Sequence, residues 1–531
     1  MAFDRIKKTK SGSYKYRVES YWDSTLQAPR SRSVYLGKID EATGELIQGK
    51  TIRRFGIHPD RVLDFGHVMV CRRLAEDAGI LPALRASFGD EKAELLLLLA
   101  TYLVCEESPL YIFERWQEGV YQAVGLEPRH CTSTAISGLL QDVGVASGAR
   151  LCFQKDVAEV NRTNACHALL DATSISTYSQ LDGYARYGHN RDDERLPQVN
   201  LQLVTLQPGN FPIVLRMIEG SINDVSTLKN AIALMASLGI DDVEVVADRG
   251  YFSAGNLAEL HAAGAKVLIP VPATNRLFKD AMQRFSRSVR RPGNAFTDKG
   301  STYYAVKYDL TFQGIEYEAC LLLNETRKQG EVGRLYDKLE KVEYSFASEP
   351  PEHRWEALEK MNQFGADIAR LFKLTRRDDG TWQIRRKEKA ISRRINRMGY
   401  MLLLATRHYE TPLDMLETYH GRDAVEKLFD NLKNALDGDR LRVHSEEAAE
   451  GKVFLALLAM MLHAILQERL APSRKELGRR VSPREAMMDL RNIKYVKLPD
   501  GTPMLSEIAK RQRRIVQLLN VPDDYLSIKE A

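Results

Sequence analysis

The sequence contains few cysteines and no hydrophobic run long enough to cross a membrane. Its six cysteines include no CxxC pair and no metal-binding spacing with histidine, which argues against a structural zinc site and fits a reducing compartment. The longest apolar runs, Leu95–Cys105 and Val453–Leu466, are shorter than the ~18–20 residues that span a bilayer, so we expect buried helices. The opening residues MAFDRIKKTKSGSYKYRVES contain no apolar signal segment. We therefore expect a cytoplasmic protein with no membrane partner.

Glycine and proline are also not abundant, and neither sign of charge dominates. The 34 glycines and 19 prolines among 531 residues exclude a collagen-like or linker-dominated chain. With 44% hydrophobic and 28% charged residues, the chain has enough apolar surface to bury a core, which excludes disorder. At roughly 150 residues per domain, the length predicts three or four domains.

The net charge of +5 is mild, but it is unevenly distributed. Residues 1–60 hold twelve Lys and Arg against seven Asp and Glu. Lys373–Arg397 contains ten basic and three acidic residues, and Asn275–Arg291 contains six basic residues and one acid. Each cluster alone is compatible with a solvated surface. Aromatic residues accompany the clusters at Tyr14, Tyr16, Trp22 and Trp382. Three such clusters together favour contacts with nucleic-acid phosphates.

The hydrophobic pattern divides the N-terminal half into three parts. Residues 1–58 alternate like short strands and predict a small basic β module. Residues 59–163 follow the helical period and predict a helical DNA-binding domain. From residue 164 to 271 the pattern predicts the order β-β-β-α-β-α-β. Three meandering strands followed by βαβ crossovers predict an α/β fold, a mixed sheet covered by helices.

The rhythm breaks over residues 272–395, which we interpret as a β-rich insertion. The sheet is expected to resume in residues 396–470, where MGYMLLLATRH predicts a last strand. Residues 471–531 are expected to form a helical C-terminal region, with dimerisation as a candidate role.

Two aspartates each follow an apolar run, Asp171 in HALLDATS and Asp248 in VEVVADRGY. Either one alone is equally well explained as a helix cap or a turn residue. Two acids at strand ends of one sheet, however, predict a cleft at the edge of that sheet.

The segment ETYHGRDAVEKLFDNLKNALDG predicts a helix with two distinct faces. At 100° per residue, the four polar residues Tyr419, Arg422, Glu426 and Lys433 share one 60° stripe. The apolar face beside it consists of Val425, Leu428, Phe429, Leu432 and Leu436. A salt-bridged surface helix is the alternative, because Arg422 and Glu426 are an i,i+4 pair.

The two acids and this four-residue stripe together resemble the DDE transposases of bacterial insertion sequences. Within them, they resemble the group with a Y-x2-R-x3-E-x6-K signature and a β-rich insertion before the glutamate. The resemblance covers residues 164–470, and the strings YGHNRDDERLPQ and YLGKIDEATG also look familial. It implies an RNase H-like catalytic core that the insertion interrupts.

The resemblance implies a metal site formed by Asp171, Asp248 and Glu426. Two divalent cations, Mg²⁺ or Mn²⁺, suit in-line displacement at phosphorus, and carboxylates are the ligands that such hard ions prefer. We expect Asp171 to bridge both ions, with Asp248 and Glu426 on one each. The reaction would be strand cleavage and strand transfer by a cut-and-paste route.

The resemblance also implies double-stranded DNA as partner, both the terminal inverted repeats of the element and the target. A homodimer in the synaptic complex and a nucleoid-associated place in the bacterial cytoplasm follow from the same resemblance. The expected DNA contacts are Tyr419, Arg422, Lys433, Arg249, His189 and Trp382. For His189 a turn position is the alternative, and for Trp382 and Trp355, which could stack on a flipped base, the alternative is core packing.

Three other functions compete with this hypothesis. A domesticated, non-cleaving DNA-binding protein would not need all three acids. A two-carboxylate glycosidase would leave the basic clusters and the polar helix stripe without a role. A different RNase H-like nuclease also remains an alternative, and cleavage that requires Mg²⁺ or Mn²⁺ tests for activity of this kind.

Overall fold

The computed structural model describes most of the chain. The described residues are 2–9, 12–23, 28–39, 46–47, 59–106, 108–122, 131–162, 167–176, 183–186, 197–207, 209–219, 225–240, 244–421, 427–429, 443 and 445–527. The chain forms two compact units. Unit 1 consists of Met1–Arg73, Glu114–His130 and Pro472–Ala531. Unit 2 consists of Leu74–Phe113 and Cys131–Ala471.

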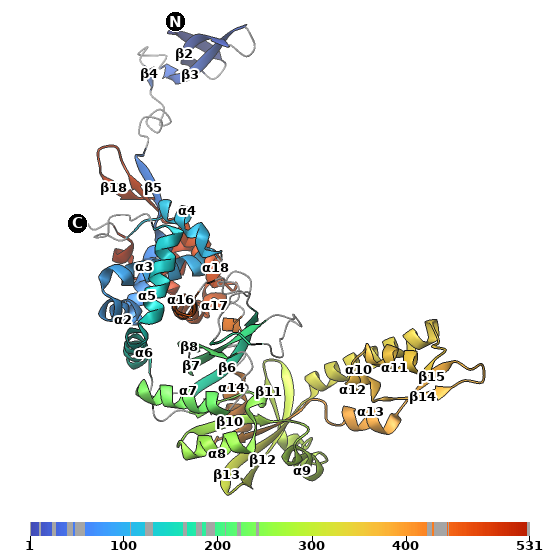
Figure 1. The fold of residues 1–531 in the computed structure, drawn as a ribbon. Coiled ribbons are helices and arrows are strands. Elements are labelled where there is room, and N and C mark those ends of the chain that lie inside the picture. Colours follow the sequence, from blue (N-terminus) through green and yellow to red (C-terminus); the bar gives the residue numbers. More distant parts are fainter. Residues whose placement is uncertain are drawn as a thin grey trace. The chain divides into compact units, whose positions relative to one another are not determined.

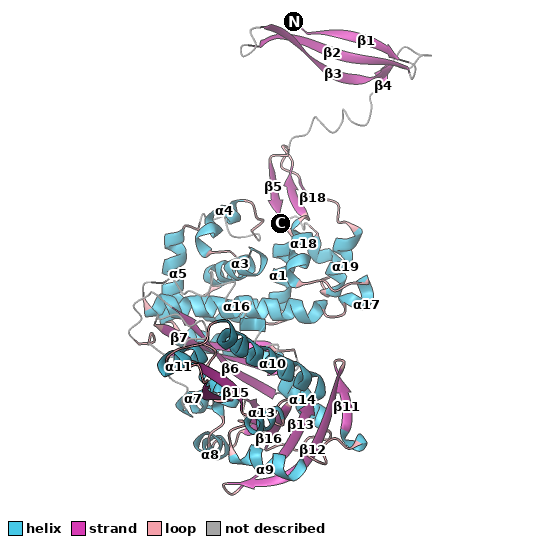
Figure 2. Ribbon diagram, turned by 90° about the vertical axis from the view of Figure 1, so that its right-hand side faces the viewer, coloured by secondary structure: helices cyan, strands magenta, loops and turns pink. Residues whose placement is uncertain are grey.

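The N-terminal strands of unit 1 form a four-stranded antiparallel sheet in the order β1-β2-β3-β4 (Figure 2). Their bounds are β1 Ala2–Thr9, β2 Gly12–Asp23, β3 Ala28–Ile39 and β4 Leu46–Ile47. These are the short strands that the alternating pattern predicted. Among the described side chains of this sheet, Val18 is the buried apolar one, whereas Trp22 is 62% exposed.

The rest of unit 1 joins chain segments that are far apart in the sequence. Strand β5 pairs with β17, and β17 pairs with β18, in an antiparallel three-stranded sheet. The bounds are β5 Arg61–Asp64, α4 Phe113–Glu118, α17 Ser473–Leu477, α18 Pro483–Arg491, β17 Lys494–Lys497, β18 Pro503–Leu505, α19 Lys510–Leu518 and η5 Asp523–Leu526. The C-terminal region is therefore not only helical as expected. β5 supplies a pairing partner, and its Asp64 carboxylate accepts hydrogen bonds from Lys494 and from Arg491 at 2.6 Å.

A group of helices fills one part of unit 2. They are α2 Ile80–Phe88, α3 Asp90–Glu106, η2 Leu110–Ile112, α5 Ser133–Val145, α6 Ser147–Asn161 and α16 Glu446–Leu470, and α1 Gly66–Asp77 crosses between the units. Helix α16 is long and apolar enough to cross a membrane by length and composition, but 89% of its most apolar window is buried inside the structure. The apolar run Val453–Leu466 is thus a core helix, as predicted.

The other part of unit 2 is built on a nine-stranded mixed sheet in the order β11-β12-β13-β16-β10-β9-β6-β7-β8 (Figures 1 and 2). The elements are β6 His167–Ser176, β7 Gln198–Gln207, β8 Phe211–Glu219, α7 Val225–Ser237, β9 Glu244–Val246, η3 Arg249–Tyr251, α8 Ala254–Ala262, β10 Lys266–Val271, α9 Arg276–Phe285, η4 Pro292–Asn294, β11 Ala295–Asp298, β12 Ser301–Phe312, β13 Ile315–Asn324, β16 Tyr400–Ala405 and α14 Pro412–His420. From β6 to β10 the order is the predicted β-β-β-α-β-α-β, and β16 is the predicted last strand. β9 runs parallel to both β6 and β10, and the other pairs are antiparallel.

The expected β-rich insertion differs from the structure. Strands β11, β12 and β13 extend the main sheet, because β13 pairs with β16 from Glu318 to Leu323. What remains, residues 325–398, is mainly helical and is called the arm below: α10 Glu325–Ser348, α11 Arg354–Asn362, α12 Ala366–Ala369, β14 Phe372–Arg376, β15 Trp382–Arg386 and α13 Glu388–Ile395 (Figure 1). The arm has its own core, which includes Leu339 and Phe372.

Candidate active site

The parallel pairing of β6 with β9 ends two residues before each of the two predicted catalytic aspartates. Strand β6 pairs in parallel with β9, and the last of these pairs is Leu169 with Val246. Two residues further along, the same register brings Asp171 level with Asp248. Neighbouring paired strands lie about 4.8 Å apart, so the two chains leave the paired region next to each other.

The expectation that Asp171 ends its strand is wrong. β6 continues to Ser176, because β7 pairs with it along the whole of its length. Only the parallel pairing with β9 stops before Asp171. Asp171 therefore lies just beyond the pairing with β9, and the pairing with β7 holds its backbone on one side.

Asp248 does lie where its strand ends, as predicted. The Ala247 amide donates to the Leu268 carbonyl at 3.1 Å, so the chain stays on the sheet until the residue before Asp248. The Asp248 carboxylate then accepts the Arg249 amide hydrogen bond at 2.6 Å and caps the short helix η3. Asp248 is half-buried and Arg249 is exposed.

The end of helix α14 lies against the same face of the sheet. A methyl group added at Gly421 would come within 3.2 Å of Leu169 Cδ1. Leu169 and Asp171 are two residues apart on β6 and therefore occupy the same face. The chain that leads to Glu426 thus starts next to the strand that carries Asp171.

The structure describes only part of the single helix expected from Glu417 onward. α14 ends at His420, and Gly421, a residue with low helix propensity, forms a turn. Tyr419 lies in the last turn of α14. The angular stripe stays a prediction, because Arg422, Glu426 and Lys433 lie outside the described residues. After the turn, Leu428 and Phe429 are buried at 2% and 4% exposure, as the predicted apolar face requires.

Several predicted site residues lie outside the described residues. They are Arg422, Glu426, Lys433 and His189, together with the side chain of Asp171. The apolar-face residues Val425, Leu432 and Leu436 also lie outside them.

Comparison with known proteins identifies the family. The model of the family described as "Transposase DDE domain" matches residues 162–462, which is more than half of the chain. The chain belongs to this family. It is a DDE transposase.

A solved structure with similarity to the transposase is a cryo-EM structure of a piggyBac transposase synaptic complex with hairpin DNA. The sequence identity is 10% and the TM-score is 0.36, and the similarity covers 78% of this chain and 70% of that chain. No protein in the comparison with curated sequences matches the chain.

The donor chemistry of the transposase site suits hard divalent cations. Mg²⁺ binds oxygen ligands and is typically held by one or two carboxylates, and the register brings two aspartate positions together at the end of β9. Within the part of the chain that the structure describes, no three histidine, cysteine or acidic side chains gather as a metal site. The expected set includes the Asp171 side chain and Glu426, which lie outside that part.

The structure places the remaining predicted DNA contacts in different surroundings. Tyr419 is half-buried on α14, next to His420, whose Nδ1 lies 3.5 Å from an Asp298 carboxylate oxygen. Trp382 packs against the core of the arm, and its amide donates to the Pro351 carbonyl at 2.8 Å. The exposed tryptophan of the arm is Trp355, which is 62% exposed and stacks on His353.

One buried polar pair near the site was not predicted from the sequence. Gln202 on β7 is fully buried and accepts a hydrogen bond from Arg216 Nε on β8 at 2.7 Å. Burial lowers the pKa of the Arg216 guanidinium. Gln202 pairs with Ala172, so this pair occupies the face of the sheet opposite to the Asp171 position. The available signal was a polar residue inside an apolar stretch of each of two neighbouring strands: Gln202 follows Leu201 on β7, and Arg216 follows Leu215 on β8.

Proposed function

We propose that this transposase mobilises a bacterial insertion sequence and belongs to the group with the Y-x2-R-x3-E-x6-K signature. It binds the terminal inverted repeats of its element and cuts and joins DNA with Asp171, Asp248 and Glu426. The parallel register that brings Asp171 level with Asp248 carries this proposal. The contact of Gly421 with Leu169 supports the third position, because Glu426 follows five residues later.

The three carboxylates form the binding site for two divalent ions, Mg²⁺ or Mn²⁺. Two such ions, when bound, supply charge that favours both the attacking and the leaving oxygen of a phosphodiester displacement. In this proposal Asp171 would serve both ions, and Asp248 and Glu426 would hold one each. The protein contributes fixed positions: β7 holds β6 on one side, and the Arg249 amide orients the Asp248 carboxylate.

Basic and aromatic residues beside the carboxylates position the DNA strand. Arg422 offers a planar fork to phosphate oxygens and Lys433 a point charge. Tyr419, His189 and Arg249 are further strand contacts in this proposal, and the exposure of Arg249 next to Asp248 suits that role. Trp382 is the proposed stacking residue from the arm, although its packing against the core of the arm limits the surface that it offers.

The proposal extends to the assembly and its location. Membership of the transposase family supports double-stranded DNA as the partner, at both the transposon ends and the target. A homodimer would bring two ends together, with each copy cutting one end. The enzyme would act in the bacterial cytoplasm, on the nucleoid.

Isosteric removal of single carboxylates tests the catalytic assignment. We expect Asp171→Asn, Asp248→Asn and Glu426→Gln to abolish cleavage of terminal-repeat DNA while binding is largely kept, because cations of Lys and Arg supply most DNA affinity. Cleavage by the wild type should need Mg²⁺ or Mn²⁺ and stop with a chelator.

The exposed Asp280 on α9 provides the matched control, and Asp280→Asn should cut like the wild type. Near wild-type cleavage by any of the three site variants would remove that residue from the site. Binding without any cleavage by the wild type would favour the non-cleaving alternative.

A further inference from the structure

The C-terminal part of unit 1 is a second basic region of this unit, besides the N-terminal residues 1–60. Residues 473–527 contain twelve Lys and Arg and seven Asp and Glu. Four of the basic residues lie in the single helix α19, with the sequence KRQRRIVQL. Between Ile508 and Pro522 the sequence has no acidic residue.

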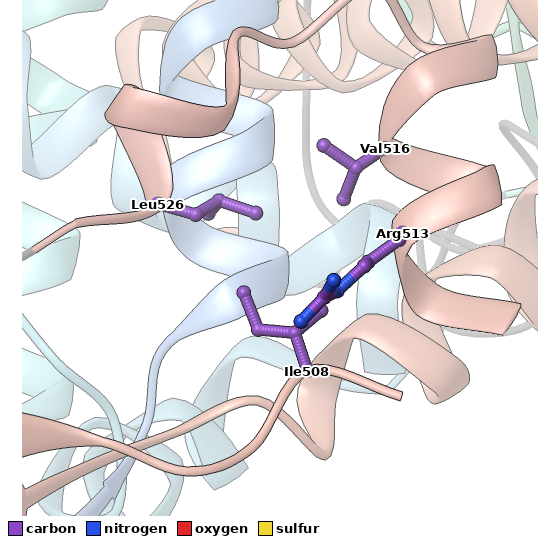
Figure 3. Close-up of a pocket in the computed structure, with 4 residues that line it drawn as sticks. All are labelled: Ile508, Arg513, Val516 and Leu526. Atoms are coloured by element: carbon purple, nitrogen blue, oxygen red, sulfur yellow. The ribbon is translucent and has the colours of Figure 1, made fainter. Parts of the chain in front are cut away.

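Helix α19 presents three of these four charges on one side. Lys510, Arg513, Arg514 and Gln517 are all exposed and, at 100° per residue, fall within an arc of about 100°. The opposite side is apolar, with Ile515 and Val516 buried at 0% and 1% exposure. A shallow cavity of about 210 Å³ adjoins this apolar side. Figure 3 shows the four residues that line it, Ile508, Arg513, Val516 and Leu526.

Neighbouring contacts hold the helix in place. Arg511, which lies off the exposed stripe, forms an ion pair with Asp489 of α18 at 2.7 Å. The Gln512 side chain donates to the Asp489 carbonyl at 2.9 Å and accepts the Ala509 amide hydrogen bond at 2.7 Å. The stripe is therefore presented by a helix that is anchored to α18 on its inner side.

The charge arrangement is unfavourable for an isolated helix. The positive end of a helix dipole favours acidic residues in the first turn, but α19 has none there and begins with Lys510 and Arg511. The residue before the helix, Ala509, has no side-chain oxygen that could cap the first amide groups. Lys510 and Arg514 are also like charges at i,i+4, which is destabilising. An anion at this end would relieve all three effects.

An ordinary solvated helix face in this protein looks different. The long surface helix α10 mixes both signs along its length and forms the i,i+4 ion pair of Arg327 with Glu331 at 2.8 Å. α19 carries four cations in five residues without one acid. General solubility does not require this asymmetry.

We propose that the stripe formed by Lys510, Arg513 and Arg514 binds the phosphate backbone of duplex DNA. The spacing of the three cations along one helix face suits successive phosphates of a strand, and Arg can contact phosphate oxygens in a bidentate manner. The proposal rests on the proposed function to the extent that the protein acts on DNA. It adds a contact surface outside the catalytic core, in the unit that also contains the N-terminal basic sheet.

The test measures DNA affinity of the full-length protein without any divalent metal, in an Asp248→Asn background. A fluorescein-labelled random-sequence duplex is titrated at several salt concentrations. We expect Arg513→Gln/Arg514→Gln to weaken binding about tenfold at low salt and to reduce the slope of log affinity against log salt by about 2, because each lost phosphate contact lowers it by ~0.9. Arg513→Lys/Arg514→Lys should keep the wild-type slope.

The matched control removes the same charge from another exposed helix of unit 1. Arg474→Gln/Lys475→Gln on α17 should leave the salt slope unchanged. Equal losses for both double variants would show a general charge effect and overturn the proposal, as would an unchanged slope for the α19 variant. A change in oligomeric state without a change in DNA affinity would assign the stripe to an acidic protein surface instead. Because no cleavage is measured, failure of the catalytic assignment leaves this result intact.

Discussion

A single methyl group added at the contact between α5 and α16 should destabilise unit 2 strongly. Gly144 of α5 and Gly451 of α16 are buried where the two backbones approach most closely. A Cβ at Gly144 would lie 1.7 Å from the Glu447 carbonyl oxygen, and one at Gly451 would lie 1.8 Å from the Leu140 carbonyl oxygen. In both cases the obstacle is backbone, so no side-chain rotation can relieve the overlap.

The magnitude follows from this geometry. Ordinary contact is about 3.5 Å, so Gly144→Ala requires the helices to separate by about 2 Å along the line of contact. Overpacking usually costs about 1–3 kcal/mol, and we expect the upper end here because α16 is buried along most of its length. Gly138, on the same helix α5, has no atom within 4 Å of a Cβ position. Gly138→Ala should therefore stabilise by up to ~1 kcal/mol through helix propensity.

Urea unfolding of the full-length variants, followed by far-ultraviolet circular dichroism, separates these effects. Gly144→Ala should unfold at a clearly lower urea concentration than the wild type, and Gly138→Ala at the same or a higher one. Equal midpoints for the two variants would mean that the backbones of α5 and α16 do not approach as described, and the reasoning would fail.

Two further predictions concern stability at other places. Burial lowers the pKa of His67 from 6.5 to about 4, so the unfolded chain binds more protons than the folded chain between these pH values. The free energy of unfolding should therefore fall by up to about 3 kcal/mol as the pH drops through that window. In unfolding experiments at several pH values, His67→Phe should remove this loss and His261→Gln should not. Leu428→Asp should unfold or aggregate the protein because it buries a charge, whereas Arg422→Ala should impair cleavage and melt like the wild type. An early melt of Arg422→Ala would make that residue structural.

The elements with a clear local pattern were predicted well. From β6 to β10 each strand or helix carries its own periodicity, so the order of elements could be read without any contact information. The buried Leu428 and Phe429 followed from helical spacing in the same way. Local patterns also suggested a strand end at Asp171, where the apolar run stops, but the pairing of β6 with β7 extends the strand.

What the sequence did not predict depends on long-range pairing. Nothing in the short segment Arg61–Asp64 indicates that its partner is Lys494–Lys497, because pairing of short strands is decided by the whole fold. For the same reason, strands β11 to β13 were assigned to an insertion and not to the main sheet. The stripe of α19, by contrast, could have been found, since its acid-free run is visible in the sequence.

The pairing of β5 with β17 sets an order of events during synthesis. The two strands are more than 400 residues apart, so at ~5–20 residues per second β5 leaves the ribosome about 20–80 s before its partner. The nine-stranded sheet already has all of its strands once residue 405 has been made. Unit 2 can therefore assemble its sheet on the ribosome. During this time β5 has no partner strand, and its unpaired edge can form non-native strand pairs. In this chain β5 is among the early elements of unit 1 to be made and among the last to be paired.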